Sequence, residues 1–134
     1  MKQLTMKYLV LSYVYEWEYK KYFEYIDVFQ LIAPFGIYKG FIPKQEVKTI
    51  TACSKKWDGL NCEAFKQTLF KIKINNQIHI KLAIGNLGAL YGSWNFCEPN
   101  NQELVLFSEP SEPIYEELKA FFEKRWEKSG EVQV

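Results

Sequence analysis

The sequence has very little arginine and histidine, and this scarcity limits which side chains could contact a phosphate group. Of its 17 basic residues, all except Arg125 are lysines, so the planar, two-pronged contact between a guanidinium and a phosphate is almost excluded. Any phosphate contact must come from lysines acting as point charges. His79 is the only histidine, so chemistry that needs two imidazoles requires a second copy of the chain.

Long hydrophobic runs and a strong net charge are also missing. The apolar stretch from Tyr8 to Tyr15 is too short to span a bilayer, and Glu16 closes it. Lys2 and Lys7 precede this stretch, but no small-residue cleavage site follows it, so we predict a cytoplasmic protein without membrane association. The net charge of +1 argues against a strong attraction of the whole chain to nucleic acid, although a local basic patch is compatible with it.

Cysteine is scarce too, and its spacing does not follow a metal-binding pattern. Cys53, Cys62 and Cys97 are an odd number of cysteines without a C-x-x-C pair. We therefore predict reduced, partly buried thiols in a cytosolic domain. The alternatives are a zinc site that includes His79 or a disulfide between Cys53 and Cys62. We expect no metal and no cofactor.

The residues that are present predict a single α/β domain over residues 1–134. A chain of this length with 48% hydrophobic and 25% charged residues can form one sizeable core, and it is too short for two. The hydrophobic periodicity predicts strands over 6–15, 35–42, 47–53, 69–75, 78–84, 89–96 and 104–107, and a helical turn over 62–66. Asn75-Asn76 predicts a hairpin turn between the fourth and fifth of these strands.

Two amphipathic helices are expected to flank the sheet. The first, over 18–32, repeats Tyr19, Tyr22, Phe23, Ile26 and Phe29 at helical spacing, which favours core packing over a base-stacking surface. The second begins at Ser111 as N-cap and ends at Gly130. Its expected buried residues are Ile114, Leu118, Phe121, Phe122 and Trp126. The predicted fold class is a mixed β-sheet flanked by helices.

The candidate chemistry is concentrated in a predicted hairpin over residues 78–96. Strand alternation places His79 and Lys81 on one face of its first strand, and Ser93 and Asn95 lie two apart on the return strand. A turn of Gly85-Asn86-Leu87-Gly88 joins the two strands. If both polar faces point the same way, an imidazole, an ammonium, a hydroxyl and an amide converge, which is typical of an oxyanion or phosphate site.

This pattern resembles the signature of the phospholipase D superfamily, the HKD phosphodiesterases. The matching residues are His79 and Lys81 for H-x-K, Gly92, Ser93 and Asn95 for G-S-x-N, and Asn101 and Glu103 for N-x-E. Asn86 occupies the place of the family's usual Asp, and the spacing from it to Gly92 is one residue shorter than the commonest pattern. The resemblance covers residues 68–128 and implies a phospholipase D-like fold.

The resemblance implies a metal-independent phosphodiesterase, with a nuclease as the expected class. His79 would attack phosphorus to form a phosphohistidine. Lys81 and Asn95 would hold the non-bridging oxygens, Ser93 would add a hydrogen bond, and Glu103 would fix the imidazole tautomer. The family's mechanism uses two histidines, so a chain with one is expected to form a homodimer that shares the active site.

Other residues are weaker candidates for contacts with a nucleic-acid substrate. Lys71 and Lys73 could extend a cationic surface toward the site, and a solvent-facing strand edge explains them equally well. Lys55, Lys56 and Trp57 could bind a phosphate and stack on a base, although a solvated loop is the favoured interpretation. Two alternatives to the nuclease are also open: a catalytically degenerate homologue that binds nucleic acid or a protein partner, and a hydrolase of lipid or small phosphodiesters.

Overall fold

The structure is a computed structural model that describes residues 8–11, 16–53, 62–97 and 103–131. Its helical elements are α1 (Glu16–Ile26), the short 3₁₀ helix η1 (Glu63–Lys66) and α2 (Pro113–Lys128). Its strands are β1 (Tyr8–Leu11), β2 (Val28–Ile32), β3 (Val47–Thr51), β4 (Phe70–Ile74), β5 (Lys81–Gly85), β6 (Gly88–Gly92), β7 (Glu103–Ser108) and β8 (Gly130–Glu131).

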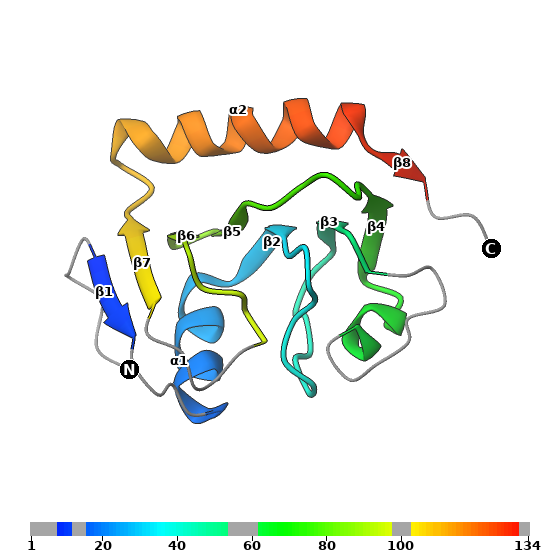
Figure 1. Cartoon of the computed structure of the whole chain (residues 1–134). Coiled ribbons are helices and arrows are strands. Elements are labelled where there is room, and N and C mark those ends of the chain that lie inside the picture. The colour runs from blue at the N-terminus through cyan, green and yellow to red at the C-terminus, as the bar shows by residue number, and fades with distance from the viewer. Residues whose placement is uncertain (1–7, 12–15, 54–61, 98–102, 132–134) are drawn as a thin grey trace.

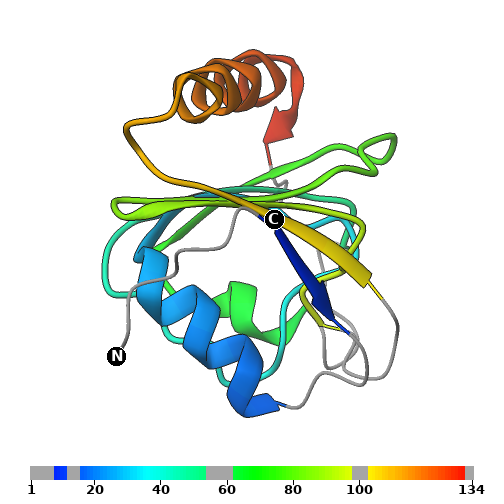
Figure 2. The same cartoon turned by 90° about the vertical axis from the view of Figure 1, so that its left-hand side faces the viewer.

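One mixed β-sheet contains all the strands of the described residues, in the order β1-β7-β6-β5-β2-β3-β4-β8 (Figure 1). β3 pairs in parallel with both β2 and β4. The other pairings are antiparallel. Helix α2 covers one face of the sheet, and α1 and η1 lie on the other (Figure 2). The predicted fold class, a mixed sheet flanked by helices, is confirmed.

The larger part of the core lies between the sheet and α1 with η1. Phe23 of α1 is at its centre and makes edge-to-face contacts with Tyr38, Phe41, Trp94 and Phe96. Such aromatic pairs add to the gain from burial itself. Phe23, Tyr38 and Phe41, from the aromatic-rich first half of the chain, are therefore used in packing.

The smaller part of the core lies between the sheet and α2. Tyr115 and Phe122 of the helix are buried against Ile32, Leu82 and Ile84 of the central strands. Leu118, Phe121 and Trp126 are partly buried on the same side. Apolar side chains at this spacing form one stripe of a helix, which is why α2 lies along the sheet.

The predicted first helix is correct in type but too long. It ends at Ile26, because Asp27 adopts a positive φ of 56° and the chain then enters the sheet as β2. Residues Val28 to Ile32 are buried except Phe29, which is half-buried. A short apolar run of this kind fits a buried strand as well as a helix, and tertiary pairing decides between them.

Two predictions from the sequence are wrong: a strand over residues 35–42 and a hairpin turn at Asn75-Asn76. Residues 35–42 form a loop instead of a strand, with Ile37, Tyr38 and Phe41 buried and Phe35 and Ile42 exposed. Gly36 and Gly40 adopt positive φ angles of 102° and 96° that interrupt an extended path. The turn at Asn75-Asn76 does not make a hairpin, because β3 and β2 lie between β4 and β5 in the sheet. The chain crosses the sheet at that point.

Helix α2 begins close to the predicted start. Its N-cap is Glu112 and not Ser111, and Pro113 occupies the first turn, where the missing N–H is tolerated. The helix ends at Lys128, and the Ser129 hydroxyl donates to the Arg125 carbonyl oxygen at 2.7 Å. Gly130 then begins β8, which pairs with the end of β4.

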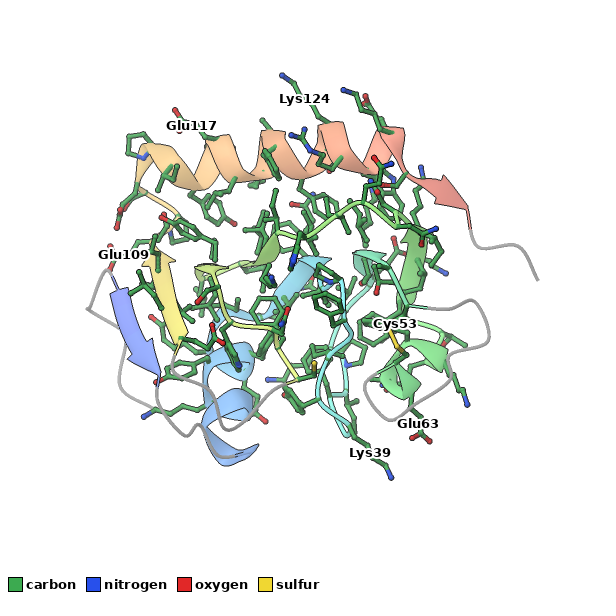
Figure 3. The ribbon with its side chains drawn as sticks, viewed as in Figure 1. Lys39, Cys53, Glu63, Glu109, Glu117 and Lys124 are labelled. Atoms are coloured by element: carbon green, nitrogen blue, oxygen red, sulfur yellow. A yellow bond between two sulfur atoms is a disulfide. The ribbon has the colours of Figure 1, made fainter. Side chains whose placement is uncertain are left out.

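Cys53 and Cys62 form a disulfide, which is visible beside η1 in Figure 3. The prediction of reduced thiols is wrong for this pair, and the alternative of a zinc site using these two sulfurs is excluded while the bond exists. Their Cα atoms are 6.2 Å apart, within the range that a disulfide requires. Cys97 is half-buried, and its thiol donates to the Phe35 carbonyl oxygen at 3.7 Å. In the described part of the chain, no helix has the length and hydropathy of a membrane span.

Candidate functional site

The hairpin of β5 and β6 brings the motif residues to one edge of the sheet. Gly85 pairs with Gly88 across a two-residue turn, and Lys81 pairs with Gly92 at the other end. β7 continues the sheet beside β6, with Val105 opposite Gly92. The start of β5, the end of β6 and the start of β7 therefore lie together. His79, Lys81, Ser93 and Glu103 come from these three strand ends.

His79 and Lys81 form a hydrogen-bonded pair. His79 is exposed, just before β5, whereas Lys81 is 8% exposed. The Lys81 Nζ lies 2.9 Å from the His79 Nδ1. An ammonium can only donate, so Nδ1 accepts and the imidazole proton of the neutral ring is on Nε2. The Phe35 ring lies edge-on to the imidazole at 5.5 Å and supports this pair from one side.

Ser93 and Glu103 form the second pair. The Ser93 hydroxyl donates to Glu103 Oε2 at 2.5 Å and accepts from the Leu104 backbone N–H at 3.1 Å. The Ser93 N–H donates to the Leu104 carbonyl oxygen at 3.0 Å. Glu103 thus connects the start of β7 to Ser93, the residue that follows β6. This arrangement differs from the expected contact between Glu103 and His79, because Lys81 occupies the Nδ1 of the ring.

Gly92 and Asn95 show how the G-S-x-N segment is shaped. Gly92 has a φ of 151°, and a Cβ there would overlap the Leu104 carbonyl oxygen, so β6 and β7 approach closely only with glycine. The strand ends at Gly92, so Ser93 and Asn95 are not placed by strand alternation as expected. Asn95 is half-buried between the buried residues Trp94 and Phe96.

Asn86 lies far from this edge, at the turn of the hairpin. Its Nδ2 donates to Asp27 Oδ2 at 2.9 Å and its backbone N–H donates to the Asp27 carbonyl oxygen at 3.2 Å. The length of β5 separates it from Lys81, about 13 Å at the usual rise of a strand. Asn86 therefore connects the hairpin to the end of α1.

The remaining predicted contact residues are not beside His79. β4 is three strands from β5, about 14 Å at normal strand spacing. On it Lys71 is exposed, and the Lys73 ammonium donates to the Trp126 carbonyl oxygen at 3.1 Å and lies 4.6 Å from the centroid of that indole ring. Lys55, Lys56, Trp57 and Asn101 lie outside the described residues.

A pocket of about 420 Å³, which residue patterns did not predict, adjoins the His79–Lys81 pair. It lies between the hairpin and α2, and its apolar walls include Leu82, Tyr91, Leu118 and Phe121. Burial raises the pKa of the Tyr91 hydroxyl, and the charge of Glu112 raises it further. In the sequence, Leu118 and Phe121 follow the same helical spacing as core residues. Only the packing of α2 on the sheet shows that they line a pocket.

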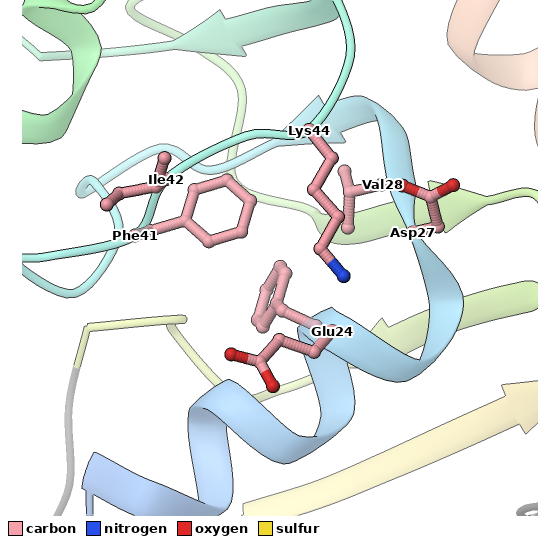
Figure 4. Close-up of a pocket in the computed structure, with 7 residues that line it drawn as sticks. Glu24, Asp27, Val28, Phe41, Ile42 and Lys44 are labelled. Atoms are coloured by element: carbon pink, nitrogen blue, oxygen red, sulfur yellow. The ribbon is translucent and has the colours of Figure 1, made fainter.

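A second cavity, beside α1, is much smaller. Its volume of about 20 Å³ gives room for about one water molecule. Figure 4 shows Glu24 and Lys44 pointing toward it from opposite sides, and Phe41 and Val28 also line it. Within the described ranges, no three His, Cys, Asp or Glu side chains gather closely enough to hold a metal ion.

Comparison with known proteins shows a likeness of fold. No protein-family model and no curated protein matches the sequence. Among solved structures, the chain is similar to TrmBL2, described as an archaeal chromatin protein whose structure shows a novel mode of DNA binding. The TM-score is 0.56 at 14% identity, over 98% of this chain and 56% of that one. The chain thus spans little more than half of TrmBL2, and the likeness shows the fold alone.

Proposed function

We propose that this chain is a phospholipase D-like domain that binds nucleic acid, and that His79 and Lys81 bind a phosphodiester group of its backbone. The observation that carries this proposal is the 2.9 Å hydrogen bond between the Lys81 ammonium and the His79 Nδ1. It leaves the imidazole Nε2–H and the remaining ammonium protons as neighbouring donors. A phosphodiester presents two non-bridging oxygens that accept such hydrogen bonds.

The same hydrogen bond favours binding over cleavage. A nucleophilic imidazole needs an unprotonated nitrogen to attack phosphorus, and a carboxylate on the opposite nitrogen normally provides that tautomer. Here Nδ1 accepts from Lys81, so Nε2 carries the proton of the neutral ring. Glu103, which could have reversed the tautomer, accepts from Ser93. The site therefore resembles an anion-binding site more closely than a poised nucleophile.

Two further observations support nucleic acid as the ligand. The sequence pattern resembles a superfamily of phosphodiesterases, and the fold is similar to that of a chromatin protein that binds DNA. The small net charge of +1 is compatible with a local contact through a few lysines. We expect moderate affinity and a shallow dependence on salt, because few phosphates are neutralised.

The test is the binding of labelled single- and double-stranded DNA as a function of salt. Lys81→Met keeps an unbranched chain in the buried position and removes the ammonium, so we expect severalfold weaker binding and a salt slope smaller by about 0.7–0.9. Lys124→Met is the matched control, since Lys124 is exposed on α2 and points away from the sheet (Figure 3). Equal binding by both variants would contradict the proposal.

The role of His79 is separated by two substitutions. In His79→Gln, the side-chain amide can place an N–H donor near the position of Nε2, whereas His79→Ala has no donor. If His79 binds phosphate as a donor, His79→Gln should retain most of the affinity and His79→Ala should lose it. Equal losses in the two variants would argue against the donor role.

A second candidate is the metal-independent nuclease, and the convergence of the three motif strands favours it. In this mechanism Lys81 releases Nδ1 and the ring proton resides there, which leaves Nε2 unprotonated. Nε2 then attacks phosphorus, a P–N bond forms and the P–O bond to the leaving group breaks. The partner subunit's His79 gives its proton to the leaving oxygen, then takes a proton from water as that water displaces the histidine. The site must then be shared across a homodimer.

Cleavage of labelled DNA in excess EDTA distinguishes the two candidates. The binding proposal expects no cleavage by the wild type, whereas the nuclease requires cleavage that both His79→Gln and His79→Ala abolish. Sedimentation equilibrium under the same conditions measures the oligomeric state, because the nuclease requires a dimer. Cleavage that persists in His79→Ala would contradict the assignment of His79 in both candidates.

A further inference from the structure

We infer that the pocket beside His79 and Lys81 accepts an unpaired base of the nucleic acid, so that the domain prefers single-stranded over duplex DNA. The inference rests on the proposed function and deepens it. It starts from the position of the pocket, whose lining includes His79 and Lys81 as well as apolar residues of β5, β6 and α2. A phosphate held by the donors would thus have an apolar cavity within one nucleotide of it.

The size and access of the pocket fit a base. A volume of about 420 Å³ is within the range of roughly 300–1,000 Å³ that is usual for small-molecule sites. The lining residues His79, Ile80 and Gly92 are exposed, so the pocket opens to solvent on the side of the candidate donors. Ile80 is 42% exposed although it is a large apolar residue, and a bound base would cover it.

The walls of the pocket provide an aromatic surface. Phe121 lines the pocket and is only partly buried against the core. The guanidinium of Arg125 lies 4.1 Å from the centroid of this ring, so one face of the phenyl is already covered by a cation. The remaining face offers a stacking partner for a base. Tyr91, which also lines the pocket, adds a hydroxyl that can form a hydrogen bond with a base edge.

Duplex DNA cannot use this pocket without breaking a base pair. A base inside a double helix is stacked and paired, and removing it costs a few kilocalories per mole. An unpaired base enters without that cost and gains by stacking on an aromatic ring. Contact with the phosphate backbone alone does not distinguish single-stranded from duplex DNA. Binding of an unpaired base in the pocket therefore adds a preference for single strands.

The test compares two labelled oligomers with identical phosphodiester backbones. One is oligothymidylate, and the other is an abasic oligomer of the same length made of tetrahydrofuran units. At fixed salt we expect the wild type to bind oligothymidylate at least about fivefold more tightly, which is the low end of the stacking contribution of one base. Equal affinities for the two oligomers would overturn the inference.

Phe121→Leu identifies the surface responsible. Leucine keeps an apolar side chain against the core and removes the ring, so the preference for bases over abasic backbone should fall to about one, with abasic binding unchanged. The matched control is Phe29→Leu, another partly buried phenylalanine that packs against the same core without lining the pocket. A preference that survives in Phe121→Leu, or disappears equally in Phe29→Leu, would overturn the inference.

Failure of the pocket inference can be distinguished from failure of the proposed function. If abasic binding is strong and falls in Lys81→Met, the phosphodiester site stands whatever the bases do. If neither oligomer binds in a way that depends on Lys81, the proposed function fails and the pocket inference fails with it. A third probe, hexyl phosphate, tests for an aliphatic ligand: displacement of the oligomer by it at lower concentration than by thymidine 5′-monophosphate would overturn the assignment to a base.

Discussion

The two ends of the β5–β6 hairpin share the same strands and differ in what surrounds them. At the turn end, residues 85–88, polar groups bond to other elements of the protein. The Leu87 N–H donates to the Ile26 carbonyl oxygen at 3.1 Å, and the buried Tyr115 hydroxyl donates to the Gly85 carbonyl oxygen at 2.8 Å. Helices α1 and α2 are both connected to the sheet through this turn.

At the motif end, defined by His79, Lys81, Gly92 and Ser93, the polar side chains bond mainly to motif neighbours. His79 pairs with Lys81, and Ser93 pairs with Glu103. His79 and Ser93 are exposed, and the pocket opens beside them. The turn end is thus bonded into the fold, whereas the motif end is the part to which the proposed function assigns recognition, so substitutions at the two ends should have separable effects.

The largest expected effect is at Gly85. A Cβ there would overlap the Ile26 carbonyl oxygen, and backbone cannot move aside without displacing the end of α1. We expect Gly85→Ala to lower the free energy of unfolding by about 3 kcal/mol or more, measured by urea denaturation. Gly130→Ala is the control, since its nearest neighbour would be at 3.8 Å, and it should change stability by less than about 0.5 kcal/mol. Similar losses of unfolding free energy in Gly85→Ala and Gly130→Ala would contradict a stabilising role for the turn end.

The next effect is at Tyr115, whose pKa is raised first by burial and then by the charge of Glu116. Tyr115→Phe removes a buried hydrogen bond and should lower the free energy of unfolding by about 1–2 kcal/mol at pH 7.

A raised folded-state pKa gives stability that is present below the ordinary pKa of tyrosine and is lost as pH rises through the folded value. Unfolding measured between pH 8 and 11 should therefore show a smaller alkaline loss in Tyr115→Phe than in the wild type. An identical alkaline loss in both proteins would contradict the role assigned to this hydroxyl.

A smaller effect is expected at Asn86. Asn86→Asp restores the residue type of the phospholipase D pattern, but here it places a second carboxylate beside Asp27. We expect a loss of about 0.5–1 kcal/mol that shrinks at high salt, and no gain in DNA cleavage. Asn86→Ser, which adds no charge, should show less salt dependence. Cleavage that appears in Asn86→Asp would show that the turn end contributes to chemistry.

The smallest effect is expected at Ser93. It is exposed, so Ser93→Ala should change the free energy of unfolding by about 0.5 kcal/mol or less, although the bond to Glu103 is lost. Ser111→Ala, at an exposed position before α2, is the comparison for a serine outside the motif. A loss well above 1 kcal/mol at Ser93 would mean that the motif end also supports the fold.

Local patterns explain what could be predicted from the sequence. The Gly85–Gly88 turn, the strands beside it and helix α2 follow from residue spacing within a few turns or strand repeats. The position of Lys81 opposite Gly92 was predictable for the same reason, since a two-residue turn fixes the register of the hairpin.

Non-local packing explains the rest. Residues Val28 to Ile32 are apolar enough for a helix or a strand, and pairing with β3 and β5 makes them a strand. The partner of Glu103 and the walls of the pocket depend on which segments meet across the sheet. The disulfide requires Cys53 and Cys62 to approach within 6.2 Å between Cα atoms, which their spacing in the chain permits but does not require.

The order of strands has a consequence for self-association. β8 pairs with only Lys73 and Ile74 of β4, so the first three residues of β4, Phe70 to Ile72, have no strand on their outer side among the described residues. Open strand edges are templates for pairing with another sheet, and charged side chains on them disfavour it. Lys71 is exposed in the middle of this open segment. Lys71, which is distant from the His79–Lys81 pair, thus disfavours edge-to-edge pairing at this segment.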